Sequence, residues 1–247
     1  MKKEIKRVEI GNLNPLKRYV AFDLNTNSKI YRQKGLLYKV PRFFGSDLKF
    51  VLENLKKKKM NNVVQIKDIY TKDNKDYAYS MRYYKGYKSI RRFKSRNIHL
   101  KLEDCKKIIK AFCDLGKRNM IYYDFHKGNV LLQKKTDDIV ICDIDGLEKC
   151  RHKEDKKEQI IDAVCLCAAY IYNTDFPSMK AYVRTKRKLD NKNIIRSCLD
   201  TVGTKEFFKN VNRISEIDPE DINQNRHRIK REAKQEYKDH FDYYRKF

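Results

Sequence analysis

The first 85 residues carry short runs of β-branched and aromatic residues separated by polar turns, which is the pattern of β-strands. The runs are 18–22, 29–32, 36–40, 63–70 and 76–84. The first three predict antiparallel strands, and the last two predict a hairpin around the polar turn 71–75. Between the two groups, apolar residues repeat at helical spacing and predict a helix over about 48–58, with an N-cap in Gly45-Ser46-Asp47.

The rest of the chain has longer stretches with helical periodicity. Helices are expected over 102–117, 160–172, 194–199 and 205–211, and a last helix runs from Asp218-Pro219 towards residue 247. Strands followed by helices are typical of an α+β fold. Because no internal repeat or low-complexity linker separates the two parts, we expect one unit with a cleft between a β-rich cap and a helical base.

Three polar residues follow the predicted helix 102–117 in a spacing that suits phosphoryl transfer. Asp124 stands five residues before Asn129, on a loop that leads into an apolar strand, and Asp143 ends the next apolar strand. A carboxylate in the first position can orient an attacking hydroxyl, while the carboxamide and the second carboxylate can each hold a magnesium ion.

These residues carry a resemblance to a known family. The kinase catalytic loop H-R-D-L-x-x-x-N is followed downstream by D-F-G, and here Tyr122-Tyr123-Asp124-Phe125-His126-Lys127-Gly128-Asn129 and Asp143-Ile144-Asp145 occupy those places. The chain therefore resembles the protein-kinase-like superfamily, and its D-F-H-x-G-N loop is similar to that of aminoglycoside and choline phosphotransferases. The resemblance implies a bilobal fold with an N-lobe over 1–85 and a C-lobe over 86–247.

The resemblance also implies roles for the loop residues. Asp124 would orient or deprotonate the acceptor hydroxyl, and Asn129 and Asp143 would hold Mg²⁺ ions bridging the phosphoryl oxygens of ATP. His126 could donate to the γ-phosphate or fix the loop through a backbone carbonyl. Asp145, where glycine is usual, could be a further metal ligand, or it could accept a hydrogen bond from a group that contacts the ligands.

In the N-lobe, the resemblance puts Lys39 on the ATP phosphates, because it lies in the predicted third strand. Glu53 would pair with this lysine, although it lies well away from the apolar stripe of its helix, where a plain exposed position is an equally simple explanation. The segment from Arg82 through Tyr83 and Tyr84 to Lys85 would be the hinge whose backbone binds adenine, or else the end of an ordinary hairpin.

Several features depart from the family pattern. The turn 23–28, which would cover the phosphates, has no glycine, so its backbone should approach phosphate less closely. No Ser, Thr or Tyr lies between Gly146 and Ile161, and Tyr123 replaces the arginine beside Asp124, so activation by loop phosphorylation is not expected. Asp162 could steady the catalytic loop, or simply cap the helix 160–172.

Composition indicates the partners and the cellular compartment of this chain. The chain has 247 residues, with 58 Lys and Arg against 33 Asp and Glu, so its net charge of +25 favours contacts with polyanions and nucleic acid. Seven cysteines without C-x-x-C spacing predict a reducing, intracellular compartment. No apolar segment of membrane-spanning length and no signal peptide is apparent, so we expect a soluble cytoplasmic protein without a membrane partner.

Three functional hypotheses remain open from the sequence. The first is an ATP-dependent Ser/Thr protein kinase, which the order of the predicted elements favours. The second is a small-molecule kinase, which the D-F-H-x-G-N loop and the short segment after Asp143 favour. The third is a pseudokinase or nucleic-acid-associated scaffold, which the missing glycine loop, the uncertain Glu53 and the +25 charge favour.

Overall fold

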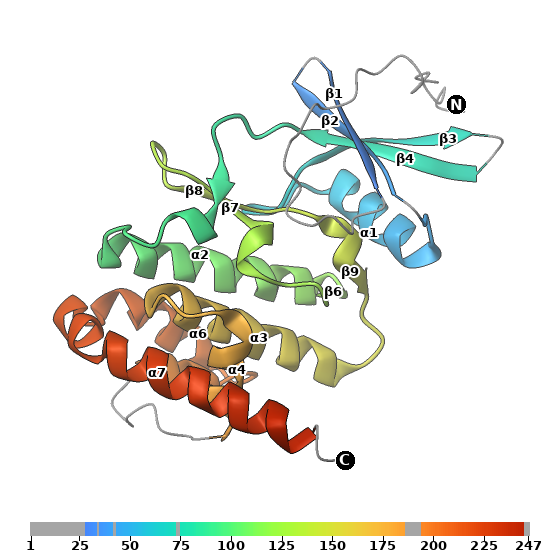
Figure 1. The fold of residues 1–247 in the computed structure, drawn as a ribbon. Coiled ribbons are helices and arrows are strands. Elements are labelled where there is room, and N and C mark those ends of the chain that lie inside the picture. Colours follow the sequence, from blue (N-terminus) through green and yellow to red (C-terminus); the bar gives the residue numbers. More distant parts are fainter. Residues whose placement is uncertain (1–27, 34, 42, 73–74, 186–193, 245–247) are drawn as a thin grey trace.

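The computed structural model describes residues 28–33, 35–41, 43–72, 75–185 and 194–244. In this part the fold is α+β, with seven α-helices and antiparallel sheets. A four-stranded sheet and one helix lie at one end of the molecule, and the remaining helices form the other end (Figure 1). The predicted strand 18–22 and the turn 23–27 lie outside the described residues.

The four-stranded sheet is antiparallel and has the order β1-β2-β4-β3. Its strands are β1 (Lys29–Gln33), β2 (Leu36–Val40), β3 (Ile66–Lys72) and β4 (Lys75–Arg82). Both predicted hairpins are therefore present. Lys39 on β2 lies directly opposite Tyr79 on β4, and directly opposed residues project from the same face of a sheet. This pairing brings an ammonium group and a phenol together on one face.

Helix α1 (Ser46–Lys57) lies between β2 and β3 in the chain. It buries the predicted stripe of Leu48, Val51, Leu52 and Leu55 and packs against β3 and β9. It starts two residues earlier than predicted, and the residue at its N-cap is Gly45, whose backbone carbonyl accepts from Lys49. The N-cap therefore lies in the predicted segment, and no side-chain hydrogen bond is made at this end.

Helix α2 (Ile98–Lys117) leads into a group of short strands. These are β5 (Lys88–Ser89), β6 (Met120–Tyr122), β7 (Val130–Gln133), β8 (Asp138–Ile141) and β9 (Leu147–Lys149). Strands β5, β7 and β8 form one sheet, and β6 pairs with β9. These pairings hold the loop after β6 beside the turn after β8. Strands β6 and β7 flank the loop, and they pair with β9 and β8, which flank the turn.

Five more helices complete the described chain. They are α3 (Lys153–Ile171), α4 (Phe176–Thr185), α5 (Ile194–Asp200), α6 (Glu206–Asn212) and α7 (Pro219–Tyr244). Asp218 caps α7 by accepting from the Glu220 amide at 2.9 Å, as its place before Pro219 predicts. Helix α3 begins seven residues earlier than predicted, inside the charged run, where Glu154 and Asp155 suit the first turn of a helix.

Short 3₁₀ turns connect these elements, namely Ile90–Arg92, Lys127–Asn129, Ile144–Gly146 and Arg213–Glu216. One apolar core runs from α1 through α2 and α3 to α7, so the sheet end and the helical end share it. All seven cysteines are free thiols. No helix of the described ranges combines the length and apolar character needed to cross a bilayer.

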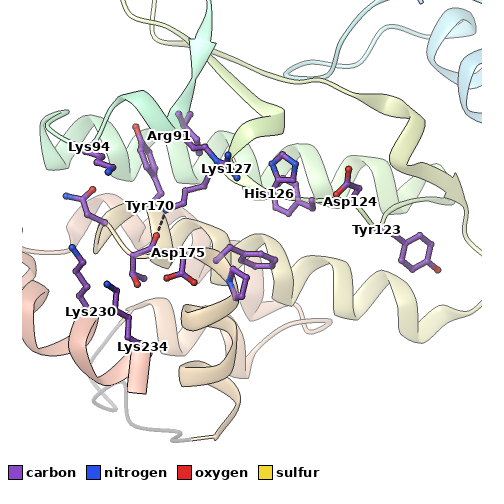
Figure 2. Close-up of a pocket in the computed structure, with 16 residues that line it drawn as sticks. Arg91, Lys94, Tyr123, Asp124, His126, Lys127, Tyr170, Asp175, Lys230 and Lys234 are labelled. Carbon is purple, nitrogen blue, oxygen red and sulfur yellow. Dashed lines mark hydrogen bonds between the residues drawn. The ribbon is translucent and has the colours of Figure 1, made fainter. Parts of the chain in front are cut away.

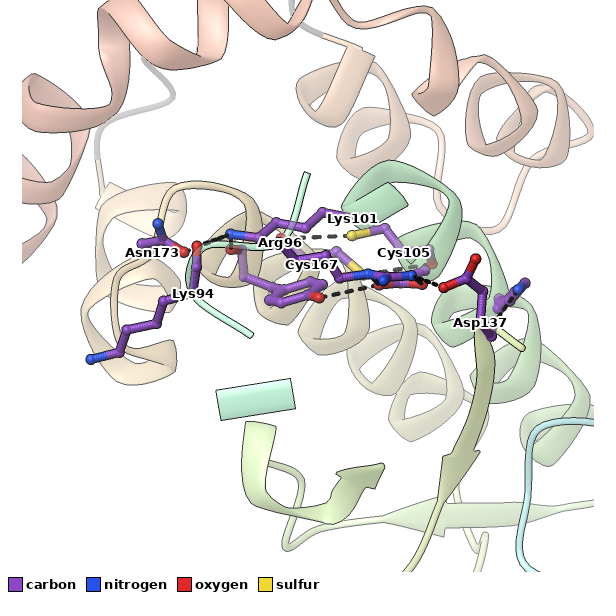
Figure 3. Close-up of polar contacts among 10 residues, drawn as sticks. Lys94, Arg96, Lys101, Cys105, Asp137, Cys167 and Asn173 are labelled. Atoms are coloured by element: carbon purple, nitrogen blue, oxygen red, sulfur yellow. Dashed lines mark hydrogen bonds and ion pairs between the residues drawn. The ribbon is translucent and has the colours of Figure 1, made fainter. Parts of the chain in front are cut away.

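Charged residues are buried between α2 and α3 (Figure 3). Arg96 donates to Asp104 at 2.8 Å and to Asp137 at 2.6 Å, and the Tyr170 hydroxyl donates to Asp104 at 3.1 Å. Lys101, which is fully buried, donates to the Asn173 side chain at 2.7 Å and to the Lys94 carbonyl at 2.9 Å. These contacts satisfy the buried charges and fix the chain after η2 (Ile90–Arg92) against α3.

Candidate active site

Lys39 joins the four-stranded sheet to the turn after β8. Its side chain is buried, and its Nζ lies 2.6 Å from Asp143 Oδ1 and 2.8 Å from Asp145 Oδ2. Burial alone would lower the pKa of Lys39, but the carboxylates of Asp145 and Asp143 outweigh it and raise this pKa above its usual value. Lys39 therefore stays an ammonium group in contact with two carboxylates.

Asp145 is held by three donors. Besides Lys39, the Tyr79 hydroxyl donates to its Oδ1 and the Ser28 hydroxyl donates to its Oδ2 at 3.4 Å. Burial, followed by the negative charge of Asp145, raises the pKa of Tyr79 well above its usual value, so the phenol keeps its proton and remains a donor. Of the two roles expected for Asp145, these contacts suit the acceptor role better than the metal-ligand role.

Asp143 has a left-handed backbone, with φ 57° and ψ 55°. Residues other than glycine rarely adopt this conformation, and where it occurs the surrounding structure has to hold it. Here the Tyr122 hydroxyl donates to the carbonyls of Cys142 at 2.7 Å and of Asp143 at 2.8 Å. Tyr122 thus holds the backbone from which the Asp143 carboxylate projects. The sequence did not reveal this role.

The loop after β6 lies against this turn. The Asn129 side-chain amide donates to the Asp124 carbonyl at 3.0 Å, and the Asn129 carbonyl accepts from the Cys142 amide at 2.8 Å. The Tyr123 amide donates to the Gly146 carbonyl at 3.0 Å. Asp124, Asn129 and Asp143 are therefore brought together, with Asp124 exposed and Asn129 buried.

Gln159 on α3 supports the same loop from below. Its Oε1 accepts from the Tyr122 amide at 2.7 Å, and its Nε2 donates to the carbonyls of Phe112 at 3.1 Å and Met120 at 3.3 Å. Asp162, the residue considered for this support, lies in the middle of α3 and pairs with Lys180 at 2.7 Å. Both readings of Asp162 are therefore wrong.

His126 fixes its own loop in a way that differs from the prediction. Its Nδ1 accepts from the Gly128 amide at 2.9 Å, so it is not bonded to a carbonyl through this nitrogen. An imidazole nitrogen that accepts carries no proton, which assigns the proton of neutral His126 to Nε2. The remaining donor of His126 is then available on the side of the ring away from Gly128.

Of the residues predicted to contact the nucleotide, Glu53 and the segment 82–84 lie as follows within the protein. Glu53 is exposed on α1, and the described ion pairs of Lys39 are those with the two aspartates, so the expected pairing with Glu53 is not made. In the predicted hinge, the Tyr83 amide donates to the Gly35 carbonyl and the Tyr84 carbonyl accepts from the Tyr87 amide. Arg82 lies over the Tyr84 ring at 5.5 Å.

The oxygen donors near Lys39 meet the needs of Mg²⁺ better than those of a metal held by protein ligands alone. Within the described residues, no group of three or more His, Cys, Asp or Glu side chains could by itself hold a metal ion. Mg²⁺ needs less from a protein, because it is usually bound by one or two carboxylates together with substrate phosphates and water. Asp143, Asn129 and the adjacent Lys39 fit such a site, since they offer oxygen ligands beside a cation for phosphate.

A cavity of about 740 Å³ opens beside Asp124 on the helical side of the loop (Figure 2). Tyr123, Asp124 and His126 line one part of it, and η2 with the chain after it, α3, α4 and α7 contribute to the rest. This volume is within the range of small-molecule sites. A reacting hydroxyl could approach Asp124 from this cavity, whereas Lys39 and Asp143 are not among the residues that line it.

We expect Tyr122→Phe to impair positioning of Asp143 more than folding. Losing this hydroxyl, whose one proton is shared between two carbonyls of the Asp143 turn, should cost about 1 kcal/mol of unfolding free energy. In an assay of the phosphoryl transfer that the sequence predicts, the rate should fall about tenfold, as is typical for groups that support a metal ligand. Steady-state kinetics should place the loss in kcat rather than in KM. An unchanged kcat would mean that Tyr122 does not hold the aspartate.

Gly146→Ala should disturb the same junction by steric overlap. A Cβ at this position would lie 2.7 Å from Tyr122 Cε2 and 2.9 Å from Asp124 Cβ, and neither neighbour is the free end of a flexible side chain. We expect a loss of about 1–3 kcal/mol in unfolding free energy and about 100-fold in kcat. Gly116→Ala is the control, because its Cβ would meet nothing closer than 3.6 Å; equal effects would contradict the packing argument.

The chain matches no model of a known protein family, and no curated protein has a significantly similar sequence.

Proposed function

We propose that this chain is an ATP-dependent phosphotransferase with a bilobal, protein-kinase-like fold. The observation that carries the proposal is the contact of 2.6 Å between Lys39, from the sheet, and Asp143, in the turn after β8. Asp124 and Asn129 lie against that turn. A cation for phosphate, two metal ligands and a base for a hydroxyl are the groups that phosphoryl transfer needs.

The order of the elements supports the bilobal assignment. A lysine-bearing strand, a helix, a hairpin and a long helix precede the loop of Asp124, and the hairpin β7–β8 separates that loop from Asp143. The boundary near residue 85 falls just after β4, the last strand of the four-stranded sheet. Residues 1–85 would then form the N-lobe and residues 86–247 the C-lobe, with ATP between them.

In this mechanism each residue has one task. Lys39 would bind the α- and β-phosphates of ATP, and Asn129 and Asp143 would hold Mg²⁺, which would supply positive charge for the phosphoryl oxygens. Asp124 orients the acceptor hydroxyl and accepts its proton. His126 donates from Nε2 towards the γ-phosphate. Asp145 keeps Lys39 in place through the carboxylate that Tyr79 also contacts.

The acceptor is an alcohol, and two classes remain candidates. The cavity beside Asp124 favours a small molecule, because about 740 Å³ is a volume that such ligands fill. A Ser or Thr side chain of a protein is the second candidate, and the order of elements favours it. The third possibility, a pseudokinase or scaffold, predicts that no phosphate is transferred to an acceptor of either class.

Transfer of label from [γ-³²P]ATP tests the proposal. The wild-type chain should release or transfer the γ-phosphate in the presence of Mg²⁺, and EDTA should stop the reaction. Asp124→Asn should reduce the rate about 1,000-fold while leaving nucleotide binding intact. A wild-type rate equal to that of the Asp124→Asn variant, with both chains folded by circular dichroism, would support the scaffold instead.

A further inference from the structure

The cavity beside Asp124 has a strongly basic lining. Five cationic residues contribute to it, and they come from the chain around η2, from the catalytic loop and from α7: Arg91, Lys94, Lys127, Lys230 and Lys234. Asp124 and Asp175 are the two acidic residues of the lining. In Figure 2, Lys94, Lys230 and Lys234 lie at the end of the cavity away from Asp124.

Four of these cations are available to a ligand. Arg91, Lys94, Lys230 and Lys234 are exposed, and none of them forms an ion pair with another residue of the described ranges. Other cations nearby are paired, for example Arg228 with Glu232 at 3.5 Å and Lys180 with Asp162 at 2.7 Å. The lining therefore carries positive charge that the protein itself does not neutralise.

Asp175 has a structural task and also offsets part of this charge through Lys127. Its Oδ1 accepts from the Ser178 amide at 2.8 Å, at the start of α4. Hydrogen bonds from Ser178 outweigh the effect of burial and lower the pKa of Asp175 below its usual value. Its carboxylate caps a helix and attracts Lys127, so it offsets part of the positive charge of the lining but leaves the cations in excess.

Lys127 extends the positive field to the catalytic loop. Its ammonium donates to the carbonyls of Thr174 and, at 3.4 Å, of Ala169. Burial lowers the pKa of Lys127 to about 8 against the attraction of Asp175, and repulsion from the nearby Arg91 and Lys94 adds to the lowering. Positive charges so close together repel one another, and a bound anion would relieve this repulsion.

The basic end of the cavity is built on a rigid support. The backbone carbonyl of Lys94 accepts from the fully buried Lys101, which also contacts Asn173 and the Tyr170 carbonyl (Figure 3). Lys230 and Lys234 are one turn apart on α7 and therefore project from the same side of that helix. Cations from two separate elements are thus held around one space.

We infer that this cavity binds a small phosphomonoester that also carries a free hydroxyl, and that this compound is the acceptor of the proposed reaction. The inference rests on the proposed function for the acceptor role, whereas the anion site rests on the basic lining alone. The phosphate lies among Lys94, Lys230 and Lys234, and the hydroxyl points to Asp124. Cations that surround one end of a cavity of about 740 Å³ suit a small dianion better than an extended peptide.

Calorimetric titration without ATP tests the site directly. The probes are ribose 5-phosphate against ribose, and glycerol 3-phosphate against glycerol. The phosphorylated member of each pair should bind at least tenfold more tightly. Lys230→Gln with Lys234→Gln should weaken that binding at least tenfold, and Arg91→Gln with Lys94→Gln should do the same from another element.

The control removes the same charge elsewhere. Lys57 and Lys59 are exposed at the far end of α1 and outside the cavity, so Lys57→Gln with Lys59→Gln should change binding less than twofold. Equal losses in the control and cavity variants, or no preference for the phosphorylated probes, would overturn the inference. A phosphoserine peptide that binds tenfold more tightly than ribose 5-phosphate would also overturn it, in favour of a protein substrate.

The two proposals can fail separately. If the phosphorylated probes bind as expected but no γ-phosphate is ever released from ATP, the phosphotransferase proposal fails and the anion site stands. If ATP is turned over with Mg²⁺ but neither probe pair shows the preference, the anion site fails and the phosphotransferase proposal stands.

Discussion

Asp143→Asn should lower the rate of phosphoryl transfer about 1,000-fold. The substitution removes one negative charge and keeps the shape of the side chain. Asparagine also tolerates the left-handed backbone of this position, where φ is 57°, better than alanine would. Lys39 keeps Asp145 at 2.8 Å, so its buried ammonium is not left without a partner. We therefore expect the melting temperature to change by less than about 3 °C.

Asp138→Asn is the matched control for this prediction. Asp138 is exposed at the start of β8, five residues before Asp143, and contacts the Thr136 hydroxyl at 2.8 Å. The same change of charge there should leave the rate within about twofold of wild type, because it is remote from Lys39 and Asn129. A normal rate in Asp143→Asn would remove Asp143 from the mechanism.

Asp104→Ala should give the largest loss of stability, about 3 kcal/mol in unfolding free energy. Asp104 is fully buried on α2 and accepts from Arg96 at 2.8 Å and from Tyr170 at 3.1 Å. Burial raises the pKa of Asp104 despite these donors, so the pair itself gains little from being buried. Its truncation, however, leaves the buried Arg96 with Asp137 alone.

Urea denaturation measures this loss against a control on the same helix. Asp114 is partly exposed on α2 and pairs with Lys117 at 3.0 Å. Asp114→Ala makes the identical substitution but breaks a surface ion pair, which should cost less than about 1 kcal/mol. Similar losses in the two variants would mean that the buried position of Asp104 has no special effect.

Local patterns were sufficient for much of the fold. The stripe of α1, both hairpins and the capped start of α7 depend on residues close in sequence, and they appear in the structure where the sequence predicts them. The early start of α3 is the main error of this kind. Its first two turns are charged and polar, without an apolar stripe, so hydrophobic periodicity could not mark them.

The site was predictable in its loop residues and not in its supports. Asp124, Asn129 and Asp143 are recognisable from their spacing, and the structure brings them together. Tyr122 and Gln159 hold the site through hydrogen bonds to backbone groups 20 to 47 residues away, and such contacts leave no local pattern in a sequence.

Lys39 illustrates the same limit. Its strand position was predicted, but its partners lie 104 and 106 residues away, and one of them, Asp145, also binds a phenol from the facing strand. A pairing with Glu53 followed from the family pattern alone. The exposed position of Glu53 agrees instead with the helical geometry of α1, in which this residue lies away from the apolar stripe.

A structure with Mg²⁺ and a non-hydrolysable ATP analogue would test the central claim most directly. We expect the phosphates between Lys39 and the loop, with Lys39 contacting the α- or β-phosphate and with Asn129 and Asp143 binding the metal. The γ-phosphate should face Asp124 across the mouth of the basic cavity. A nucleotide bound elsewhere, or one bound here with the metal away from Asn129 and Asp143, would contradict the account.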